Sequence, residues 1–300
     1  MKQHRFATLL SVACVAMGGH PLSAQDASWT RMQDSVRAIA ARTPAMLGVA
    51  IVDITDGHAF YLNADSVFKT ASTIKIAILA ELYRQNNGRP RSDATAPARL
   101  DDPYALDARD QVGGSGVMGR FTPGATKLTN RDLAALMISV SDNSATNILI
   151  NRVGMLNVNA LMAAHGLTVT RLRRQMMDTK AAEAGLENTA SPRELGTFLA
   201  ALFRGDVLGK PVTDEFFTLL SIGKASYIPR YIPGGVRTAN KPGELSGVRN
   251  DAGVVFVAGR PFAIAVLTKD GVDERASEEA IARIAFEAWR CFDALSKGSL

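Results

Sequence analysis

The chain has 300 residues with a formal net charge of +5, and hydrophobic residues make up 47% of it. This length permits one large domain, or two intertwined lobes, with a substantial core. Basic residues are scattered apart from one group at Arg171, Arg173 and Arg174, which does not indicate a nucleic-acid-binding surface. The four histidines and two cysteines form no H-E-x-x-H or C-x-x-C motif, so we expect neither a metal site nor another cofactor.

Residues 1–24 predict a secretory signal peptide. Two basic residues precede an apolar stretch from Phe6 to Gly19, and small residues lead to an expected cut after Ala24. The stretch is too short to span a bilayer, so we expect a secreted or periplasmic protein without stable membrane insertion. A lipoprotein cut before Cys14 is the less favoured alternative. Only Cys291 remains in the mature chain, which rules out an internal disulfide.

Hydrophobic periodicity predicts strands near both ends of the chain and helices between them. In chain order, the expected strands are residues 47–53, 59–62, 236–239, 253–258 and 262–268. The expected helices are residues 29–41, 72–85, 129–140, 143–153, 156–165, one that begins at Ser191, 212–220 and 277–295. Residues 86–101 and 168–190 read as irregular segments.

This order of elements indicates an α/β (α+β) fold, in which an antiparallel sheet is flanked by helices and an all-α lobe is inserted. We expect residues 25–68 and 211–300 to form the α/β lobe. Residues 69–210 would form the all-α lobe, including a long loop near 168–190.

Ser72 and Lys75 form the first chemical motif. The S-x-x-K pattern also begins at Ser66 and Ser221, but only Ser72 opens an apolar helix, where residues three apart share one face. The unpaired N–H groups of a first helical turn favour a developing oxyanion. Partial burial would lower the pKa of the lysine and allow it to act as a base. Taken alone, the motif also fits a serine cap and a solvated lysine.

Ser141-Asp142-Asn143 interrupts two expected helices. The hydroxyl of Ser141 could relay a proton to a leaving nitrogen, and the amide of Asn143 could hold a substrate carbonyl. An ordinary helix cap is the simpler alternative for this triplet.

Lys241-Pro242-Gly243 lies on or next to an expected strand. Glycine permits close approach of the backbone to a ligand, and Lys241 could bind a carboxylate. A surface turn is the alternative, since proline cannot donate to a strand ladder.

The three motifs occur in the order S-x-x-K, S-D-N and K-x-G, and on them the chain resembles the class A β-lactamase and penicillin-binding-protein superfamily of active-site serine hydrolases. The resemblance covers essentially the whole mature chain and implies the β-lactamase/transpeptidase-like fold. It implies that Ser72 is the acylated nucleophile, Lys75 its activating partner and Ser141 the proton relay. The backbone N–H groups of Ser72 and Glu244 would form the oxyanion hole.

The same resemblance implies a set of substrate-binding residues. Asn143 would bind a substrate amide, and Lys241 with Gly243 would lie along the bound substrate, with the ammonium group near its carboxylate. Arg249, in the following strand region, would be a further partner of that carboxylate, and Arg237 is a less favoured one.

The chain departs from the family pattern in the loop after the helical lobe. Class A enzymes carry a glutamate there that activates the water for deacylation, but that position falls near Met176 and Met177. Glu183 is the favoured substitute base if the loop is rearranged. Otherwise Asp178, Glu183 and Glu187 are solvated loop residues, with Glu187 near Arg174.

Pro242 is the second departure, because the family usually has a hydroxyl residue there that helps to bind the substrate carboxylate. Ser246 or Arg249 could replace that contact.

Acylation and deacylation have separate barriers, and loss of a general base costs about 10²–10⁴-fold in the step that it serves. An acyl-enzyme would therefore be expected to persist.

Three functions remain open. We favour a class A-like β-lactamase that hydrolyses β-lactam antibiotics. The alternatives are a D-alanyl-D-alanine peptidase or penicillin-binding protein with slow deacylation, and a β-lactam-binding domain without turnover. In each case we expect a monomer with a small-molecule or cell-wall-peptide substrate and no nucleic-acid partner.

Overall fold

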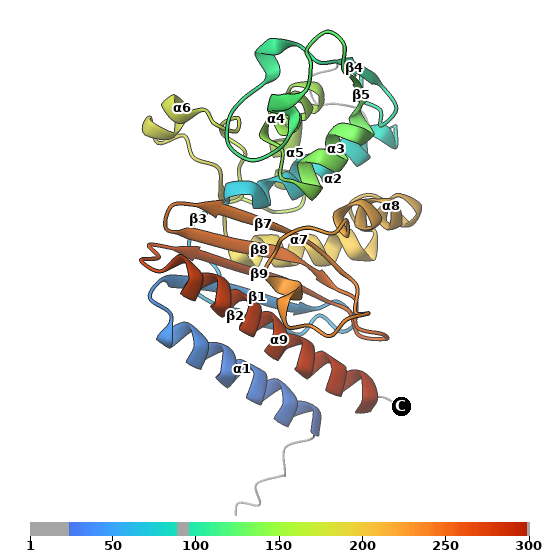
Figure 1. Ribbon diagram of the computed structural model, residues 1–300. Coiled ribbons are helices and arrows are strands. Elements are labelled where there is room, and N and C mark those ends of the chain that lie inside the picture. The colour runs from blue at the N-terminus through green and yellow to red at the C-terminus, as the bar shows by residue number, and fades with distance from the viewer. Residues whose placement is uncertain (1–23, 89–95, 299–300) are drawn as a thin grey trace, which may run out of the picture.

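The structure is a computed structural model that describes residues 24–88 and 96–298. Its centre is a five-stranded antiparallel sheet with the order β2-β1-β9-β8-β7 (Figure 1). β1 pairs with β9 along its whole length, from Met46 opposite Lys269 to Asp53 opposite Phe262, so both ends of the chain build one sheet. The strands are β1 (Met46–Asp53), β2 (Ala59–Leu62), β7 (Thr238–Leu245), β8 (Val248–Val255) and β9 (Phe262–Lys269).

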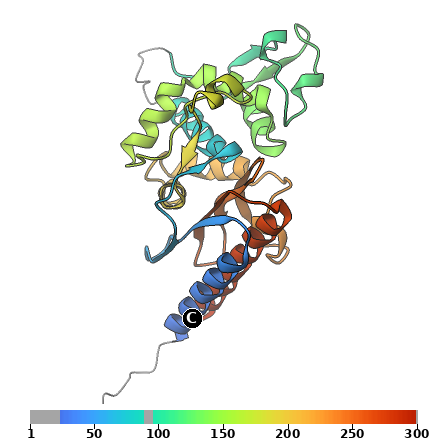
Figure 2. The same ribbon diagram turned by 90° about the vertical axis from the view of Figure 1, so that its left-hand side faces the viewer.

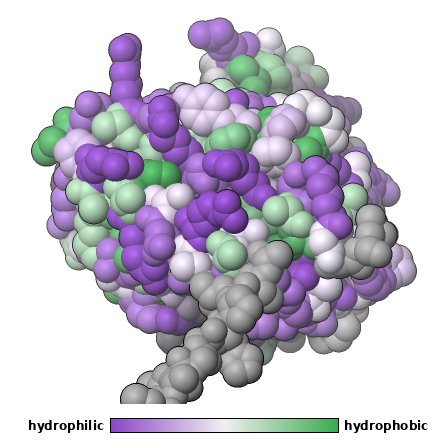
Figure 3. All heavy atoms as spheres, turned by 90° about the horizontal axis from the view of Figure 1, so that it is seen from below, coloured by the Kyte–Doolittle hydropathy of each residue, from purple (hydrophilic) through white to green (hydrophobic). Residues whose placement is uncertain are grey.

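Helices cover both faces of this sheet. α1 (Ala24–Arg42) and α9 (Glu274–Gly298) lie side by side on one face, and α7 (Pro192–Arg204) packs on the other (Figures 1 and 2). On the α9 face, the rings of Phe262 and Phe292 stack with their centroids 4.4 Å apart. Because helices lie on both faces, β1 and β9 are buried almost throughout and read as continuous hydrophobic runs. The molecular face seen from the side of α1 and α9 is mainly hydrophilic (Figure 3).

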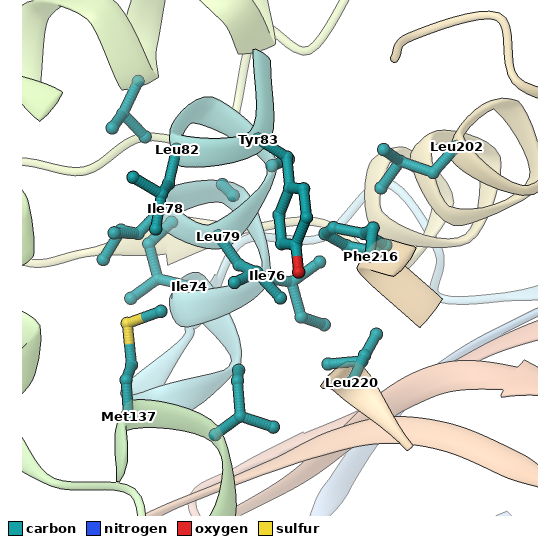
Figure 4. Close-up of a cluster of buried hydrophobic side chains, with 14 of the residues drawn as sticks. Ile74, Ile76, Ile78, Leu79, Leu82, Tyr83, Met137, Leu202, Phe216 and Leu220 are labelled. Carbon is teal, nitrogen blue, oxygen red and sulfur yellow. The ribbon is translucent and has the colours of Figure 1, made fainter. Parts of the chain in front are cut away.

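The all-α lobe is built around α2 (Lys75–Asn86), in which ten of the twelve residues are buried. Figure 4 shows its apolar side chains among residues of the neighbouring helices, and the rings of Tyr83 and Phe216 meet edge to face at 5.9 Å. This packing against neighbouring helices fixes the position of α2, which follows Ser72. The other helices of this region are α3 (Asn130–Ser139), α4 (Asn143–Val153), α5 (Met155–Ala164), α6 (Thr179–Glu183) and α8 (Lys210–Leu220).

Short elements complete the chain. The two-residue strands β3 (Phe68–Lys69) and β6 (Thr189–Ala190) pair with each other, as do β4 (Pro103–Ala105) and β5 (Lys127–Thr129). The 3-10 turns are η1 (Ala71–Ile74), η2 (Ala108–Asp110), η3 (Met118–Arg120) and η4 (Ile228–Arg230).

The predicted fold class is confirmed: an antiparallel sheet flanked by helices carries an inserted helical lobe. The prediction for the returning strands was too short, because β7 and β8 run through residues 240–252, where Pro242, glycines and polar residues weaken the strand pattern. Pro242 is tolerated because β7 is an edge strand. The division into lobes at residue 210 stays a prediction, although α7, expected in the all-α lobe, packs on the sheet.

The expected signal peptide lies almost wholly outside the described residues, and its predicted cut falls at Ala24, where α1 begins. Within residues 24–88 and 96–298, none of the helices combines the length and apolar character needed to cross a membrane.

We predict that Gly243→Ala destabilises the protein by about 1–3 kcal/mol. A Cβ atom at Gly243 would lie 2.7 Å from the carbonyl oxygen of Thr70 and 2.9 Å from the backbone nitrogen of Ser72, so β7 would have to move away from η1. Urea unfolding of both variants measures the effect, with Gly234→Ala as the control, since nothing lies within 4 Å of that position. Equal midpoints for the two variants would contradict this account.

Candidate active site

The three sequence motifs meet at a cleft made of two adjoining hollows of about 320 Å³ and 330 Å³. Ser72, Ser115 and Glu244 line both hollows, so Ser72 stands where they join. A larger hollow of about 560 Å³ lies between α1 and α9, but no member of the three motifs lines it. We therefore place the candidate site at Ser72.

Ser72 is held in the 3-10 turn η1 by the backbone around it. Ala71, just before it, has φ +48°, a conformation that costs a non-glycine residue about 1–3 kcal/mol. The amide of Asn250 on β8 donates to the carbonyl oxygens of Lys69 (2.8 Å) and Thr70 (3.1 Å). The strained turn is thus anchored to the sheet, and it presents the hydroxyl to the cleft.

Lys75, the first residue of α2, is completely buried. Its Nζ donates to the carbonyl oxygen of Ser141 (2.7 Å), to Ser141 Oγ (3.0 Å) and to Asn143 Oδ1 (3.1 Å). Burial, and next the charge of Lys241, hold the pKa of Lys75 well below its usual range. The solvated-lysine alternative is therefore wrong, and burial favours the neutral form of this amine beside Ser141.

Ser141 lies between the nucleophile and both lysines. Its Oγ donates to Ser72 Oγ at 2.9 Å and accepts from Lys75 and from Lys241, each at 3.0 Å. Its backbone, between α3 and α4, has φ +54°, which is a strained conformation for a residue other than glycine. One hydroxyl therefore links Ser72 and Lys75 to Lys241, which lies far along the chain.

Asp142 carries the capping function that the sequence left as an alternative. Its carboxylate accepts the N–H of Ala145 at the start of α4 (2.9 Å), as an N-cap does. The same carboxylate accepts the N–H groups of Val117 (2.6 Å) and Met118 (2.8 Å). The triplet is thus both a cap and a functional elbow, and the cap ties the elbow to the loop that forms the cleft rim.

Asn143 faces the cleft and joins that rim to Lys75. Its Nδ2 donates to the carbonyl oxygen of Gly113 (3.2 Å), and its backbone N–H donates to that of Ser115 (3.0 Å). Ser115, which lines both hollows, is not among the predicted site residues, although the G-G-S-G run at 113–116 indicates a loop able to approach a ligand closely.

Lys241 on β7 is almost fully buried and donates to Ser141 Oγ and to the carbonyl oxygen of Pro242, each at 3.0 Å. Burial lowers the pKa of Lys241 to about 7, and the charge of Lys224 adds to the shift. Pro242 lines the same hollow without a hydroxyl.

Gly243 brings β7 against the turn that holds the nucleophile, and Glu244 follows it on the cleft wall. The backbones of Ser72 and Glu244 therefore flank the place where the two elements run closest. The exposed carboxylate of Glu244 accepts from the hydroxyl of Tyr227 at 2.5 Å, which turns this acid toward η4. The oxyanion-hole role of the two N–H groups stays a prediction.

Two expected carboxylate partners lie elsewhere. Arg249 has its guanidinium bound by Glu274 and Glu278 of α9, on the sheet face opposite the one to which Asn250 points. Ser246 lies in the exposed turn between β7 and β8, and neither it nor Arg249 lines the two hollows. The prediction that they compensate for Pro242 is therefore corrected.

Met176 and Met177 line the hollow beside Ser72, at the position where the family pattern has a base. The side chain of Asn147 holds Met176 by both backbone groups: Oδ1 accepts its N–H (2.8 Å), and Nδ2 donates to its carbonyl oxygen (3.0 Å). Met177 adopts φ +63°. Both thioethers therefore line the same hollow as Ser72, and neither can accept a proton from water.

The loop carboxylates do not replace the missing base. Glu183, the favoured substitute, is exposed at the end of α6 and does not line the hollow. Glu187 does line it, but its carboxylate is paired with Arg174 at 2.8 Å. Asp178 caps α6 through the N–H of Ala181. The expectation for Glu183 is therefore corrected, and the expected proximity of Glu187 and Arg174 is confirmed.

This geometry is that expected of an active-site serine hydrolase, and comparison with known proteins identifies the family. Residues 31–292 match the model of the β-lactamase enzyme family, to which the chain therefore belongs. A β-lactamase of Streptomyces fradiae is 28% identical over 84% of this chain and 82% of its own.

Two solved structures extend the comparison. A β-lactamase from Sphaerobacter thermophilus DSM 20745 is 32% identical, with a TM-score of 0.78 over 88% of this chain and 97% of its own. A point variant of PBP-A, in an acyl-enzyme complex with penicillin G, is 25% identical, with a TM-score of 0.76 over 88% and 97% of the two chains. The protein is thus a serine β-lactamase-type hydrolase of the β-lactamase and penicillin-binding-protein superfamily.

We predict that the ammonium group of Lys241 titrates at about pH 7, because its burial disfavours the charged form. NMR of protein with ¹³Cε-labelled lysine measures this, and Lys241→Arg assigns the signal. An unshifted lysine would instead titrate near the ordinary value of about 10.4.

The sign of the linked stability effect follows from the same shift. Between about pH 7 and 10 the unfolded chain binds a proton that folded Lys241 does not, so this lysine makes the folded state relatively more stable as the pH rises. A Lys241 signal that titrates near the ordinary lysine value of about 10.4 would contradict this effect of burial.

Proposed function

We propose that the protein is an exported serine hydrolase that opens β-lactam antibiotics through an acyl-enzyme at Ser72 and releases the product slowly. One observation carries the proposal: the hydroxyl of Ser141 connects Ser72, Lys75 and Lys241 through contacts of 2.9–3.0 Å. The names of the relatives, which are β-lactamases over most of the chain, support this substrate class.

Acylation begins with a proton transfer. Both hydroxyl protons first turn, so that Ser72 donates to Ser141 Oγ and Ser141 donates to the neutral amine of Lys75 across the same contacts of 2.9 Å and 3.0 Å. The amine then accepts the proton of Ser72 through Ser141, and the freed alkoxide attacks the carbonyl carbon of the cyclic amide. The backbone N–H groups of Ser72 and Glu244 stabilise the oxyanion. As the amide bond breaks, Ser141 returns a proton to the leaving nitrogen and is reprotonated by Lys75.

Deacylation lacks a dedicated base. Water must attack the ester at Ser72 beside Met176 and Met177, whose thioethers accept no proton, while Glu187 in the same hollow is paired with Arg174. The missing base costs about 10²–10⁴-fold in this step. The similar PBP-A variant forms an acyl-enzyme complex with penicillin G, which supports acylation of this chain by the same class of compound.

A peptidase acting on D-alanyl-D-alanine ends of cell-wall peptides is the second candidate, and the methionines at the base position favour it. A binding domain that is acylated without turnover is the third. We also propose that residues 1–24 direct export and that the mature protein is a monomer.

Incubation with benzylpenicillin, followed by intact-mass spectrometry, tests the proposal. We expect one adduct per chain that decays slowly, together with slow hydrolysis of a chromogenic cephalosporin. Ser72→Ala should give no adduct. Release of D-alanine from a cell-wall peptide without hydrolysis of the cephalosporin would identify the peptidase, and an adduct that survives Ser72→Ala would overturn the mechanism.

We predict that Met176→Glu speeds deacylation by about 10²-fold or more, because it places a general base in the hollow beside the ester. Decay of the benzylpenicillin adduct, followed by mass spectrometry, measures the rate. Leu186→Glu is the matched control, since it adds the same charge to an exposed position of the same loop. Equal decay in both variants would show that the position of Met176 does not limit deacylation.

A further inference from the structure

Lys224 reaches the active-site cleft although it belongs to none of the three motifs. It follows the end of α8 and lines the hollow of about 330 Å³ together with Ser72, Ser141 and Lys241. Its Nζ donates to the carbonyl oxygen of Leu220 at 2.8 Å, which fixes the ammonium group and occupies one of its three N–H donors.

Within the described part of the chain, neither Lys224 nor Lys241 forms an ion pair. The two acids that face them are already bound elsewhere. Asp251 on β8 accepts from Asn240 and from the backbone N–H groups of Tyr227 and Ile228, and Glu244 accepts from the Tyr227 hydroxyl. These hydrogen bonds are 2.5–3.0 Å long.

Two lysine side chains therefore line one hollow without an ion pair, although the charges of Asp251 and Glu244 partly offset the effect of burial on them. Burial lowers the pKa of Lys224 to about 8, and the charge of Lys224 in turn lowers the pKa of Lys241. An anion bound between the two groups would reverse both shifts and would be held by charge-assisted hydrogen bonds.

We propose that Lys224 binds the carboxylate of the substrate together with Lys241, in place of the hydroxyl that Pro242 cannot provide. This inference rests on the proposed function, since the carboxylate is that of a β-lactam, or of a peptide, acylating Ser72. It makes Lys224 a specificity residue, which favours substrates with an anionic group beside the scissile amide.

The alternative is that Lys224 only caps α8, where its contact with Leu220 satisfies one of the last carbonyl groups. A cap would affect the stability of the protein and would affect all substrates equally. A binding residue would affect only those that carry the carboxylate.

The test compares benzylpenicillin with its methyl ester, using the second-order rate constant of adduct formation at pH 7. Lys224→Met keeps the apolar stem and removes the charge. We expect it to slow acylation by benzylpenicillin about 10-fold or more and to leave acylation by the ester unchanged. Lys224→Arg should retain most of the preference for the acid, and Lys210→Met, at the start of α8, should change neither rate.

Equal losses for the acid and the ester, or a full preference for the acid in Lys224→Met, would overturn the assignment of Lys224. Failure of both compounds to acylate the wild-type protein would instead overturn the proposed function. Thermal unfolding of Lys224→Met separates a loss of folding from a loss of binding.

Discussion

Two lysine amines share one hydroxyl inside this protein, and much of the structure serves to keep them there. Lys75 and Lys241 are almost completely removed from water, yet no carboxylate of the described residues pairs with either. A buried amine without a counter-ion gives up its proton readily. Burial of the two amines destabilises the folded protein, but it also favours the neutral form of Lys75 that a base needs. Reactivity and stability are therefore opposed at these lysines.

The scaffold maintains this arrangement through packing on both sides. α2 is buried among the helices of the all-α lobe, which fixes Lys75 relative to the core (Figure 4). On the other side, Gly243 lets β7 lie against η1 at a distance that no side chain permits. Asp142 joins the elbow at Ser141 to the cleft rim. The active site is therefore a junction of two lobes, and each lobe holds one lysine.

The two halves of the reaction depend on different parts of this junction. Every group assigned to acylation comes from rigid elements or from a turn anchored to the sheet. The groups that deacylation requires would come from the loop around Met176, which Asn147 and the Arg174–Glu187 pair hold in place. Because that loop is held in place, the methionines that line the hollow beside Ser72 belong to the ordered fold.

The sequence by itself determined the sheet built from both chain ends, the helical insert and the three motifs, because hydrophobic periodicity and short motifs are local properties. It could not extend β7 and β8 through Asn240 and Asp251, whose polar side chains satisfy each other only in the paired sheet. Only the tertiary structure determines that Lys75 is buried away from water, that the guanidinium of Arg249 binds acids of α9 and that Lys224 lines the cleft. Desolvation and contacts between residues 66–100 positions apart arise from packing, which no local pattern encodes.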